Sequence, residues 1–340
     1  MSELVSILIP AFNAQDWIAR TIRSAVVQTW PWKEIIVVDD GSTDHTLAVA
    51  RQFESIHVRV ISQENCGSAA ARNKAYSLCQ GDYIQWLDAD DLLAPDKIAK
   101  QMEVALNQSK RTLLSSSWGY FFYRPTKSWF PRTSLWQDLK PVDWLFNKLD
   151  ENIWMTSQSW LVSRELAELA GPWDTRLCAD DDGEYFCRVI LSCEGIKFVP
   201  EAMSYVSAIN TGSLSKNIHS SRRKLDSQFE SICLHVKYLR SLEDSERTRA
   251  ACLKYLQRWL IYFYPECPDI VARANNLARD LGGELQMPEL NTKWDWLRRV
   301  FGWKAAKTIS FAMQGTCVLP SKSWDYVLSK LEQPSEEPAL

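Results

Sequence analysis

The sequence lacks the features that mark several common classes of protein. No two glycines stand in a G-x-G arrangement and no G-x-x-x-x-G-K-[ST] segment occurs, so the two most familiar nucleotide-binding loops are absent. The nine cysteines are scattered and none forms a C-x-x-C pair, which argues against a structural zinc site and against a disulfide framework. No uninterrupted run of about 18 apolar residues occurs, so no transmembrane helix is predicted.

A strong charge of either sign is also absent. The formal net charge is -3, and the only tight basic cluster is Arg222, Arg223 and Lys224, which we interpret as a solvated helix face. A protein that follows a nucleic-acid backbone needs a basic face, so no nucleic-acid partner is expected. Reduced thiols suit a cytoplasmic protein. Residues 1–10 carry Glu3 where a signal peptide would be basic, and Pro10 ends their apolar stretch, so they predict a first strand.

What is present is a regular alternation of apolar runs and helical patterns. Mostly apolar segments at 4–9, 35–38, 58–61 and 83–87 predict strands, and each is followed by a segment with helical periodicity. We expect Asn13 to cap the first of these helices. Strict alternation predicts an α/β fold with a mostly parallel central sheet and helices on both faces.

The rest of the chain divides into a less regular part and a helical part. Residues 111–216 hold short strand candidates and two short helices, and a helical region follows over 217–332. The tail, 333–340, is rich in Pro and Glu and is predicted to be flexible. We therefore predict one domain over 1–216, with a nucleotide-binding half at 1–110 and an acceptor-side half at 111–216. The strand candidates of the second half are 113–117, 155–162 and 197–199.

Polar segments follow all four predicted strands of the first half. Ligands of open parallel sheets bind at the carboxyl ends of the strands, so we expect these segments to meet in one crevice. They are Pro10-Ala11-Phe12-Asn13, Asp39-Asp40-Gly41-Ser42-Thr43-Asp44, the stretch from Asn65 to Asn73, and Asp88-Ala89-Asp90-Asp91.

The acidic run Asp88-Ala89-Asp90-Asp91 is the strongest of these signals. Three crowded carboxylates repel one another unless a cation neutralises them. Such hard oxygen ligands suit Mn²⁺ or Mg²⁺, bound with help from substrate phosphates. The alternative is the start of a helix before Pro95, which explains one acid better than three.

Asp39, Asp40 and Arg72 are weaker candidates. One of the two adjacent carboxylates is enough to cap the turn, so the other can accept hydrogen bonds from a base or a ribose. Arg72 follows Gly67 on a predicted helix and faces either the nucleotide or solvent.

Taken together, the four segments resemble the family 2 glycosyltransferases of the GT-A fold, over about residues 1–110 strongly and 150–215 moderately. The resemblance implies that Pro10, Phe12 and Asn13 line the nucleotide pocket. It implies that Asp40, with Asp39 beside it, addresses the base while Arg72 approaches from the other side. Asp88 would contact the ribose, and Asp90, with Asp88, would hold the metal.

The second half of the resemblance concerns the base. Gly171-Pro172-Trp173-Asp174 is similar to the family's G-x-F-D turn, and Asp181-Asp182 with Arg188 is similar to its acidic pair and arginine. The resemblance implies that Asp182 is the catalytic base, with Asp181 as second choice, and that Trp173 and Asp174 contact the acceptor. The alternative for the acidic run is a capped helix start. The family's Tyr-Arg and His are missing from 205–215, which leaves Asn210, Ser213 and Ser215 as candidates for the last metal ligand.

These features predict an inverting, metal-dependent transferase that moves a sugar from a nucleotide-diphosphate donor, a UDP-sugar by expectation, to a hydroxyl of a carbohydrate or lipid-linked acceptor in polysaccharide biosynthesis. Two alternatives remain. One is a nucleotide-sugar-binding protein without turnover. The other is a sugar-phosphate nucleotidyltransferase, which needs a Gly-rich basic loop after the first strand, where this chain has Pro10-Ala11-Phe12-Asn13.

A basic segment rich in aromatics lies at 294–313. Such a segment can lie on an anionic membrane surface, which would place the protein at the inner face of the plasma membrane. It can equally cover the catalytic domain.

Overall fold

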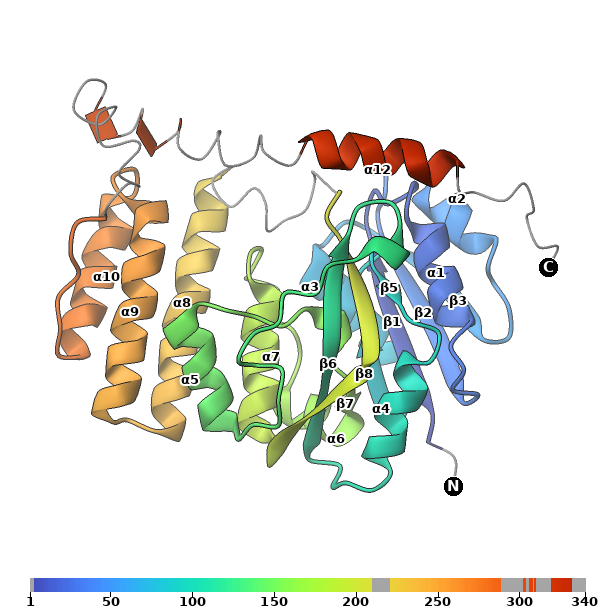
Figure 1. The fold of residues 1–340 in the computed structure, drawn as a ribbon, viewed down its shortest axis with the longest axis horizontal. Helices are drawn as coiled ribbons and strands as arrows, with labels where there is room; N and C mark the ends of the chain where they lie inside the picture. The colour runs from blue at the N-terminus through green and yellow to red at the C-terminus, as the bar shows by residue number, and fades with distance from the viewer. Residues whose placement is uncertain are drawn as a thin grey trace.

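The computed structural model describes residues 3–209, 221–288 and 319–331, together with positions 302, 303, 306, 307 and 309. Two sheets and a group of long helices make up the described chain (Figure 1). The first sheet has the strand order β3-β2-β1-β4-β7, and all its pairs are parallel except β4 with β7. Its strands are β1 (Val5–Ala11), β2 (Lys33–Asp40), β3 (Val58–Gln63), β4 (Tyr83–Trp86) and β7 (Val162–Ser163).

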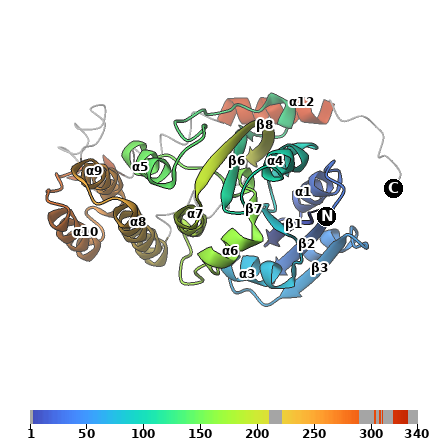
Figure 2. The same cartoon turned by 90° about the horizontal axis from the view of Figure 1, so that it is seen from below.

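Apolar side chains on both faces of β1 explain why this sheet is covered on both sides. Ile7 and Ile9 pack in one buried cluster, whereas Leu8 belongs to the cluster on the other face. Figure 2 shows α1 and α4 on one side of the strands and α3 on the other. The predicted parallel sheet with helices on both faces is confirmed. The four helices of this half are α1 (Ile18–Val26), α2 (Thr46–Arg51), α3 (Ser68–Leu78) and α4 (Lys97–Ala105).

Asn13 does not cap the first helix, so that prediction is wrong. Helix α1 begins at Ile18, after Trp17. Asn13 instead has a left-handed backbone, with φ of 47°, and its Oδ1 accepts a hydrogen bond from the Thr43 N–H at 2.9 Å. The residue therefore ties the loop after β1 to the loop after β2.

The two long strands of the second sheet extend further than the predicted segments 113–117 and 197–199. Strands β6 (Thr112–Phe121) and β8 (Gly195–Ser207) run parallel, with an irregularity between Ser116 and Ser117, and β5 (Leu92–Leu93) pairs with β8. The predicted strand at 155–162 is largely wrong, since it holds the short 3-10 helix η2 (Ser157–Ser159). The remaining elements are η1 (Pro125–Lys127), α5 (Pro141–Glu151), α6 (Arg164–Ala170) and α7 (Asp181–Ser192).

The helical region shares its core with the sheets. Phe229 and Ile232 of the first long helix are buried in the same cluster as Trp86 of β4 and Tyr185 of α7. The helices of this region are α8 (Arg222–Leu242), α9 (Glu246–Phe263), α10 (Pro268–Asp280) and α12 (Leu319–Leu331). Figures 1 and 2 show α8 beside α7, α9 beside α5 and α10 beside α9, whereas α12 lies apart from them, near the sheets. The predicted boundary near residue 216 and the tail 333–340 lie outside the described residues.

Most of the segment 294–313 also lies outside the described residues. At two positions that are described it contacts the protein. The Lys307 ammonium is buried and donates to the Tyr264 carbonyl at 2.8 Å and to Glu266 at 2.7 Å, and the ring of Trp303 lies 5.7 Å from that of Tyr264. Within the described ranges, no helix combines the length and apolarity that crossing a bilayer demands.

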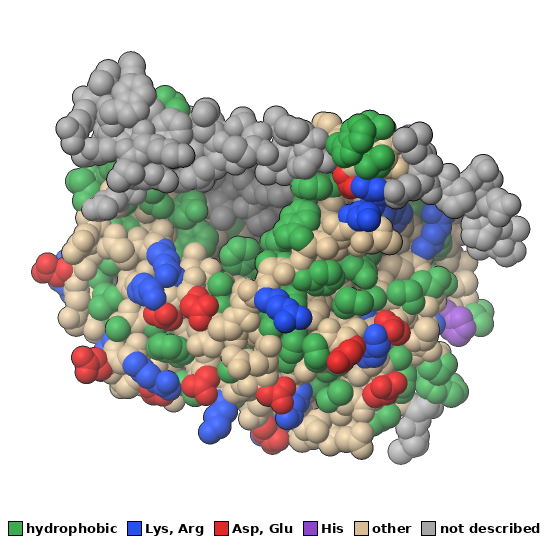
Figure 3. Space-filling view, viewed as in Figure 1, with side chains coloured by type: hydrophobic (Ala, Val, Ile, Leu, Met, Phe, Trp, Pro, Cys, Tyr) green, Lys and Arg blue, Asp and Glu red, His purple; other side chains and the backbone are tan. Residues whose placement is uncertain are grey.

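The surface carries both signs of charge. On the face shown in Figure 3, Lys and Arg side chains are interspersed with Asp and Glu. In the basic cluster at 222–224, Arg222 pairs with Asp226 on its own helix at 3.0 Å and with Asp269 of α10. The interpretation of that cluster as a solvated helix face fits these exposed pairs.

Candidate active site

Hydrogen bonds between the loops after β1, β2 and β3 build one side of the site. The backbone N–H of Asn13 donates to the Ser42 hydroxyl at 3.0 Å, next to the Asn13–Thr43 bond. Phe12, on the same loop, is 49% exposed, so its ring is accessible to a ligand. Pro10, at the end of β1, is half-buried. The predicted pocket residues of this loop therefore lie together at the carboxyl end of the sheet.

The two acids after β2 have different environments. Asp40 is buried, and its carboxylate accepts from the N–H groups of Cys66 at 2.9 Å and Gly67 at 2.8 Å. Asp39 is also buried, and its Oδ2 accepts from Ser62 at 3.3 Å, but its Oδ1 has no hydrogen-bond partner among the described residues. An unpaired buried oxygen is costly, so Asp39 is the better candidate for a ligand N–H, and Asp40 fixes the loop.

Glycine is required at two turns of these loops. Gly41 and Gly67 have φ of 69° and 93°, in the left-handed region that favours glycine. A Cβ on Gly41 would lie 2.7 Å from the Asn65 nitrogen. The loops after β2 and β3 can therefore approach closely only with glycine at position 41.

Arg72 joins the two halves of the site. Its guanidinium bonds to Asp88, after β4, and to Asp181, at the start of α7, both at 2.8 Å. Burial opposes its charge, but the two carboxylates outweigh burial and raise the pKa of Arg72. The alternative of a solvated helix residue is wrong, because the side chain is only 7% exposed.

Trp173 is a core residue. It is 2% exposed, with its ring stacked on Tyr185 at 4.1 Å and the Arg72 guanidinium 4.4 Å from the ring centroid. Asn73 holds its backbone through two hydrogen bonds, of 2.8 and 2.9 Å. The predicted sugar contact through this ring is therefore not supported, since Tyr185 and Arg72 cover its faces. Trp173 instead packs its ring against the Arg72 guanidinium.

The three acids after β4 divide into one structural residue and two accessible ones. Asp91 is buried and accepts from the Ser207 N–H of β8 at 2.8 Å. Burial first, and the neighbours Asp90 and Asp88 next, raise the pKa of Asp91. Asp88 and Asp90 are half-buried, so they are the acids of this turn that a cation can reach. Within the described residues, no group of three or more His, Cys, Asp or Glu is arranged to hold a metal.

The acidic run at the start of α7 lies on the other side of Arg72 from the turn after β4. Asp181 is held by Arg72 and by the Ser68 hydroxyl at 2.9 Å. Asp182 keeps part of its surface exposed. Burial, followed by the charges of Asp181 and Asp180, raises the pKa of Asp182 to about 7. A carboxylate with a pKa near the working pH is suited to take a proton from a substrate hydroxyl.

The other predicted residues of this side are engaged within the protein. Asp174 binds the exposed Arg176 at 2.6 Å, and its own side chain is 18% exposed. Arg188 forms a two-point pair with Glu184, at 2.7 and 2.8 Å, and donates to the Ala170 carbonyl. Ser68 was missed by sequence reasoning as a partner of Asp181. Its only signal is its place directly after Gly67, at the first residue of α3.

Comparisons with known proteins give a family match and a shared fold. The description of the family whose model matches residues 6–166 is Glycosyl transferase family 2. A putative teichuronic acid biosynthesis glycosyltransferase, TuaG of Bacillus subtilis, is 44% identical over 109 residues, 31% of this chain and 43% of that protein. Escherichia coli WfaP, a UDP-Glc:alpha-D-GlcNAc-diphosphoundecaprenol beta-1,3-glucosyltransferase, is 42% identical over 101 residues, 29% of this chain and 40% of that protein. The chain thus spans less than half the length of these relatives. Residues 6–166, in the N-terminal part of this chain, thus match the glycosyltransferase family 2 model.

A solved structure matches far more of the chain. S. aureus TarS 1–349 in complex with UDP-GlcNAc aligns with 85% of this chain and 95% of that chain, at a TM-score of 0.55 and 15% identity. At that identity the likeness shows a common fold alone. It extends past the family match at 6–166, and so includes part of the helical region. The predicted fold class, with its helical C-terminal region, is confirmed.

Proposed function

We propose that the protein transfers a sugar from a UDP-sugar to a hydroxyl group of a carbohydrate or lipid-linked acceptor, with inversion at the anomeric carbon. The family assignment supports glycosyl transfer. The UDP-sugar donor is favoured because WfaP is named for UDP-Glc and a TarS structure holds UDP-GlcNAc. The lipid-linked class of acceptor is favoured by the name of WfaP, which acts on a diphosphoundecaprenol sugar.

One observation carries the proposal. Arg72 bonds to Asp88 on the donor side and to Asp181 on the other side. The two carboxylates therefore lie on either side of a single guanidinium group. Asp182 follows Asp181 at the start of α7 and has a pKa raised to about 7. A base placed beside a donor motif is the arrangement that a single displacement needs.

The proposed reaction is one in-line step. The acceptor oxygen attacks the anomeric carbon while Asp182 takes the hydroxyl proton. The bond from that carbon to the diphosphate oxygen breaks, and its electron pair leaves with the nucleoside diphosphate. Attack on the face opposite to the leaving group inverts the configuration, and no covalent enzyme intermediate forms. On the donor side, the unpaired Asp39 Oδ1 accepts a base N–H, and the exposed ring of Phe12 lies against the nucleotide.

Mn²⁺ or Mg²⁺ fits the two accessible acids of the turn after β4. Asp90 and Asp88 would hold it together with the diphosphate oxygens, since Mg²⁺ in such sites is bound by one or two carboxylates and substrate phosphates. When bound, the ion would stabilise the negative charge of the departing diphosphate.

The test is Asp182→Asn, assayed with UDP-glucose and UDP-GlcNAc in the presence of Mn²⁺. We expect UDP release to fall by about 10²–10⁴-fold, because general-base assistance is lost. UDP affinity, measured by calorimetry, should stay near that of the unchanged protein. Equal turnover in the variant would remove Asp182 from the mechanism. A wild-type protein that binds UDP but releases none from either donor would favour a binding protein without turnover.

A further inference from the structure

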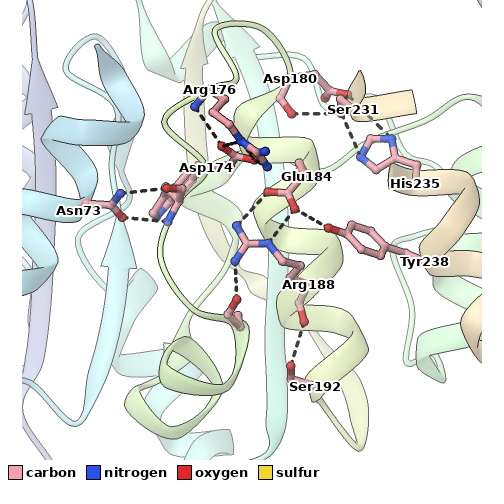
Figure 4. Close-up of polar contacts among 12 residues, drawn as sticks. Asn73, Asp174, Arg176, Asp180, Glu184, Arg188, Ser192, Ser231, His235 and Tyr238 are labelled. Carbon is pink, nitrogen blue, oxygen red and sulfur yellow. Dashed lines mark hydrogen bonds and ion pairs between the residues drawn. The ribbon is translucent and has the colours of Figure 1, made fainter. Parts of the chain in front are cut away.

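Helix α8 turns a row of polar side chains toward the start of α7 (Figure 4). The row repeats at helical spacing, so its members lie on one face of α8. Each bonds to the segment 178–184, which contains the acidic run, or to a neighbour in the row. They are Ser227, Gln228, Ser231, His235 and Tyr238.

Ser227 fixes the chain just before the acidic run. Its hydroxyl accepts from the N–H groups of Cys178 at 2.9 Å and Ala179 at 3.0 Å, and it donates to the Ala179 carbonyl at 3.1 Å. Two backbone residues are thus held by one buried side chain. Such side chain–backbone bonds set the path of a loop, since buried backbone groups need partners.

Asp180 is the residue on which the row converges. Its Oδ2 accepts from the Ser231 hydroxyl at 2.7 Å and from the Gln228 amide at 3.2 Å. Its backbone is left-handed, with φ of 56° and ψ of 30°, at the N-cap position of α7. This conformation is uncommon for a residue other than glycine, although Asp and Asn adopt it more readily than most. It sets the direction in which the chain enters α7, immediately before Asp181 and Asp182.

Two further features keep Asp180 in place. A Cβ at Gly183 would collide with the Asp180 carboxylate, so glycine at that position makes room for it. Behind Ser231, the buried ring of His235 lies 3.4 Å from the serine hydroxyl and 3.2 Å from the Tyr255 hydroxyl of α9. Burial first, and Lys148 of α5 next, lower the pKa of His235 to about 4, so the ring is neutral at physiological pH.

The same helix also contacts the first turn of α7, at Glu184. The Tyr238 hydroxyl donates to Glu184 at 2.6 Å, and Glu184 in turn pairs with Arg188. Helix α8 therefore contacts the loop before the acidic run, Asp180 at the start of that run, and Glu184 in the first turn of α7. A carboxylate that must meet an acceptor hydroxyl needs such support, because a displacement of about 1 Å can cost about 100-fold in rate.

We propose that Asp180 and Ser231 are positioning residues, through which α8 sets the orientation of Asp182 for proton transfer. The inference rests on the proposed function, since it assigns a role relative to the base of that reaction. It gives the helical region, for which the motifs offer no function, a specific task in the site.

The first test compares Ser231→Ala with Ser241→Ala, a matched change at an exposed serine of the same helix, whose hydroxyl donates to the Tyr238 carbonyl of that helix. The probe is release of UDP from UDP-glucose and UDP-GlcNAc with Mn²⁺, with water as acceptor. We expect kcat of Ser231→Ala to fall by about 10-fold to 100-fold. UDP affinity and the melting temperature should change little, and Ser241→Ala should match the unchanged protein.

The second test uses Asp180 itself. Asp180→Asn keeps a side-chain oxygen for Ser231 and tolerates the left-handed backbone, so it should retain most of kcat. Asp180→Ala loses both and should fall at least as far as Ser231→Ala. Equal turnover in Ser231→Ala and Ser241→Ala, or in the two Asp180 variants, would overturn the proposal. So would a parallel loss of UDP affinity and kcat, which indicates a general structural role. Failure of the unchanged protein to turn over either donor counts against the proposed function instead.

Discussion

The two sides of the site are stabilised in different ways. On the donor side, short loops fasten one another: Asn13 accepts from Thr43, and Asp40 accepts from Gly67. On the base side, the segment 178–184 is fastened by a helix from another part of the chain, as in the bond between Ser227 and Ala179, which are 48 residues apart. The donor-side bonds thus join loops of one sheet, over 30 and 27 residues. The base side depends on how the helical region packs.

Arg72 contacts both sides, as the Ser68–Asp181 bond also does, and because Arg72 carries the buried charge its loss should have the largest effect. Arg72→Met leaves Asp181 buried without its partner cation, at 11% exposure, and breaking a buried pair in this way costs about 3–5 kcal/mol. We expect the urea midpoint of unfolding to fall accordingly. Arg176→Met, in an exposed pair with Asp174, is the control and should leave the midpoint nearly unchanged. Similar midpoints for both variants would show that the two sides do not depend on Arg72.

Asp90→Asn tests the donor side alone, with an intermediate expected effect. If Asp90 is a metal ligand, UDP should bind about 10-fold to 100-fold more weakly in the presence of Mn²⁺, whereas binding without metal should not change. Calorimetric titration of UDP with and without Mn²⁺ separates the two. Asp138→Asn, at a surface pair with Lys197, serves as control. If Mn²⁺ strengthened UDP binding as much in Asp90→Asn as in the unchanged protein, Asp90 would be excluded as a ligand.

The pH dependence of UDP release tests the base side alone. Near neutral pH, the expected change in rate is the smallest of the three predicted effects. Burial, Asp181 and Asp180 raise the pKa of Asp182 to about 7, while Arg72 acts in the opposite direction. Because the base must be unprotonated, the rate should fall as pH decreases below about 7, by about tenfold for each pH unit. A rate profile for UDP release between pH 5 and pH 8.5, expected only to flatten above neutrality, measures this. A rate that stays constant down to about pH 5 would assign the base to a group with an ordinary carboxyl pKa.

The sequence predicts the donor side well because its signals are local. Strand β1 is apolar except for Ser6, α3 begins directly after Gly67, and the acids after β4 lie close together in the chain. These patterns are sufficient to predict the parallel sheet and the position of the loops. They do not reveal that Asp40 is engaged by backbone N–H groups and that Asp39 keeps an unpaired oxygen, because those contacts depend on the turn after β3.

The base side is less predictable because its contacts are distant in sequence. Trp173 lies beside the acidic run in sequence, which suggested an acceptor contact, but Tyr185 and Arg72 cover its ring. Ser231 has no sequence signal at all, since a serine on an amphipathic helix is ordinary. The predicted strand at 155–162 failed for a similar reason, as its apolar residues pack against two sheets without joining either over most of its length.

The core shared by α8 and the sheets has a consequence for exchanging parts between relatives. A donor-side unit that is held together by its own loops can be grafted onto another catalytic half with few changes at the seam. A base-side unit without α8 cannot be moved in this way. Removing Phe229 and Ile232 would leave a cavity in the shared core, and α7 would lose its contacts with α8. Chimeras that keep α7 and α8 from one parent should therefore fold and work more often than those that cut between them.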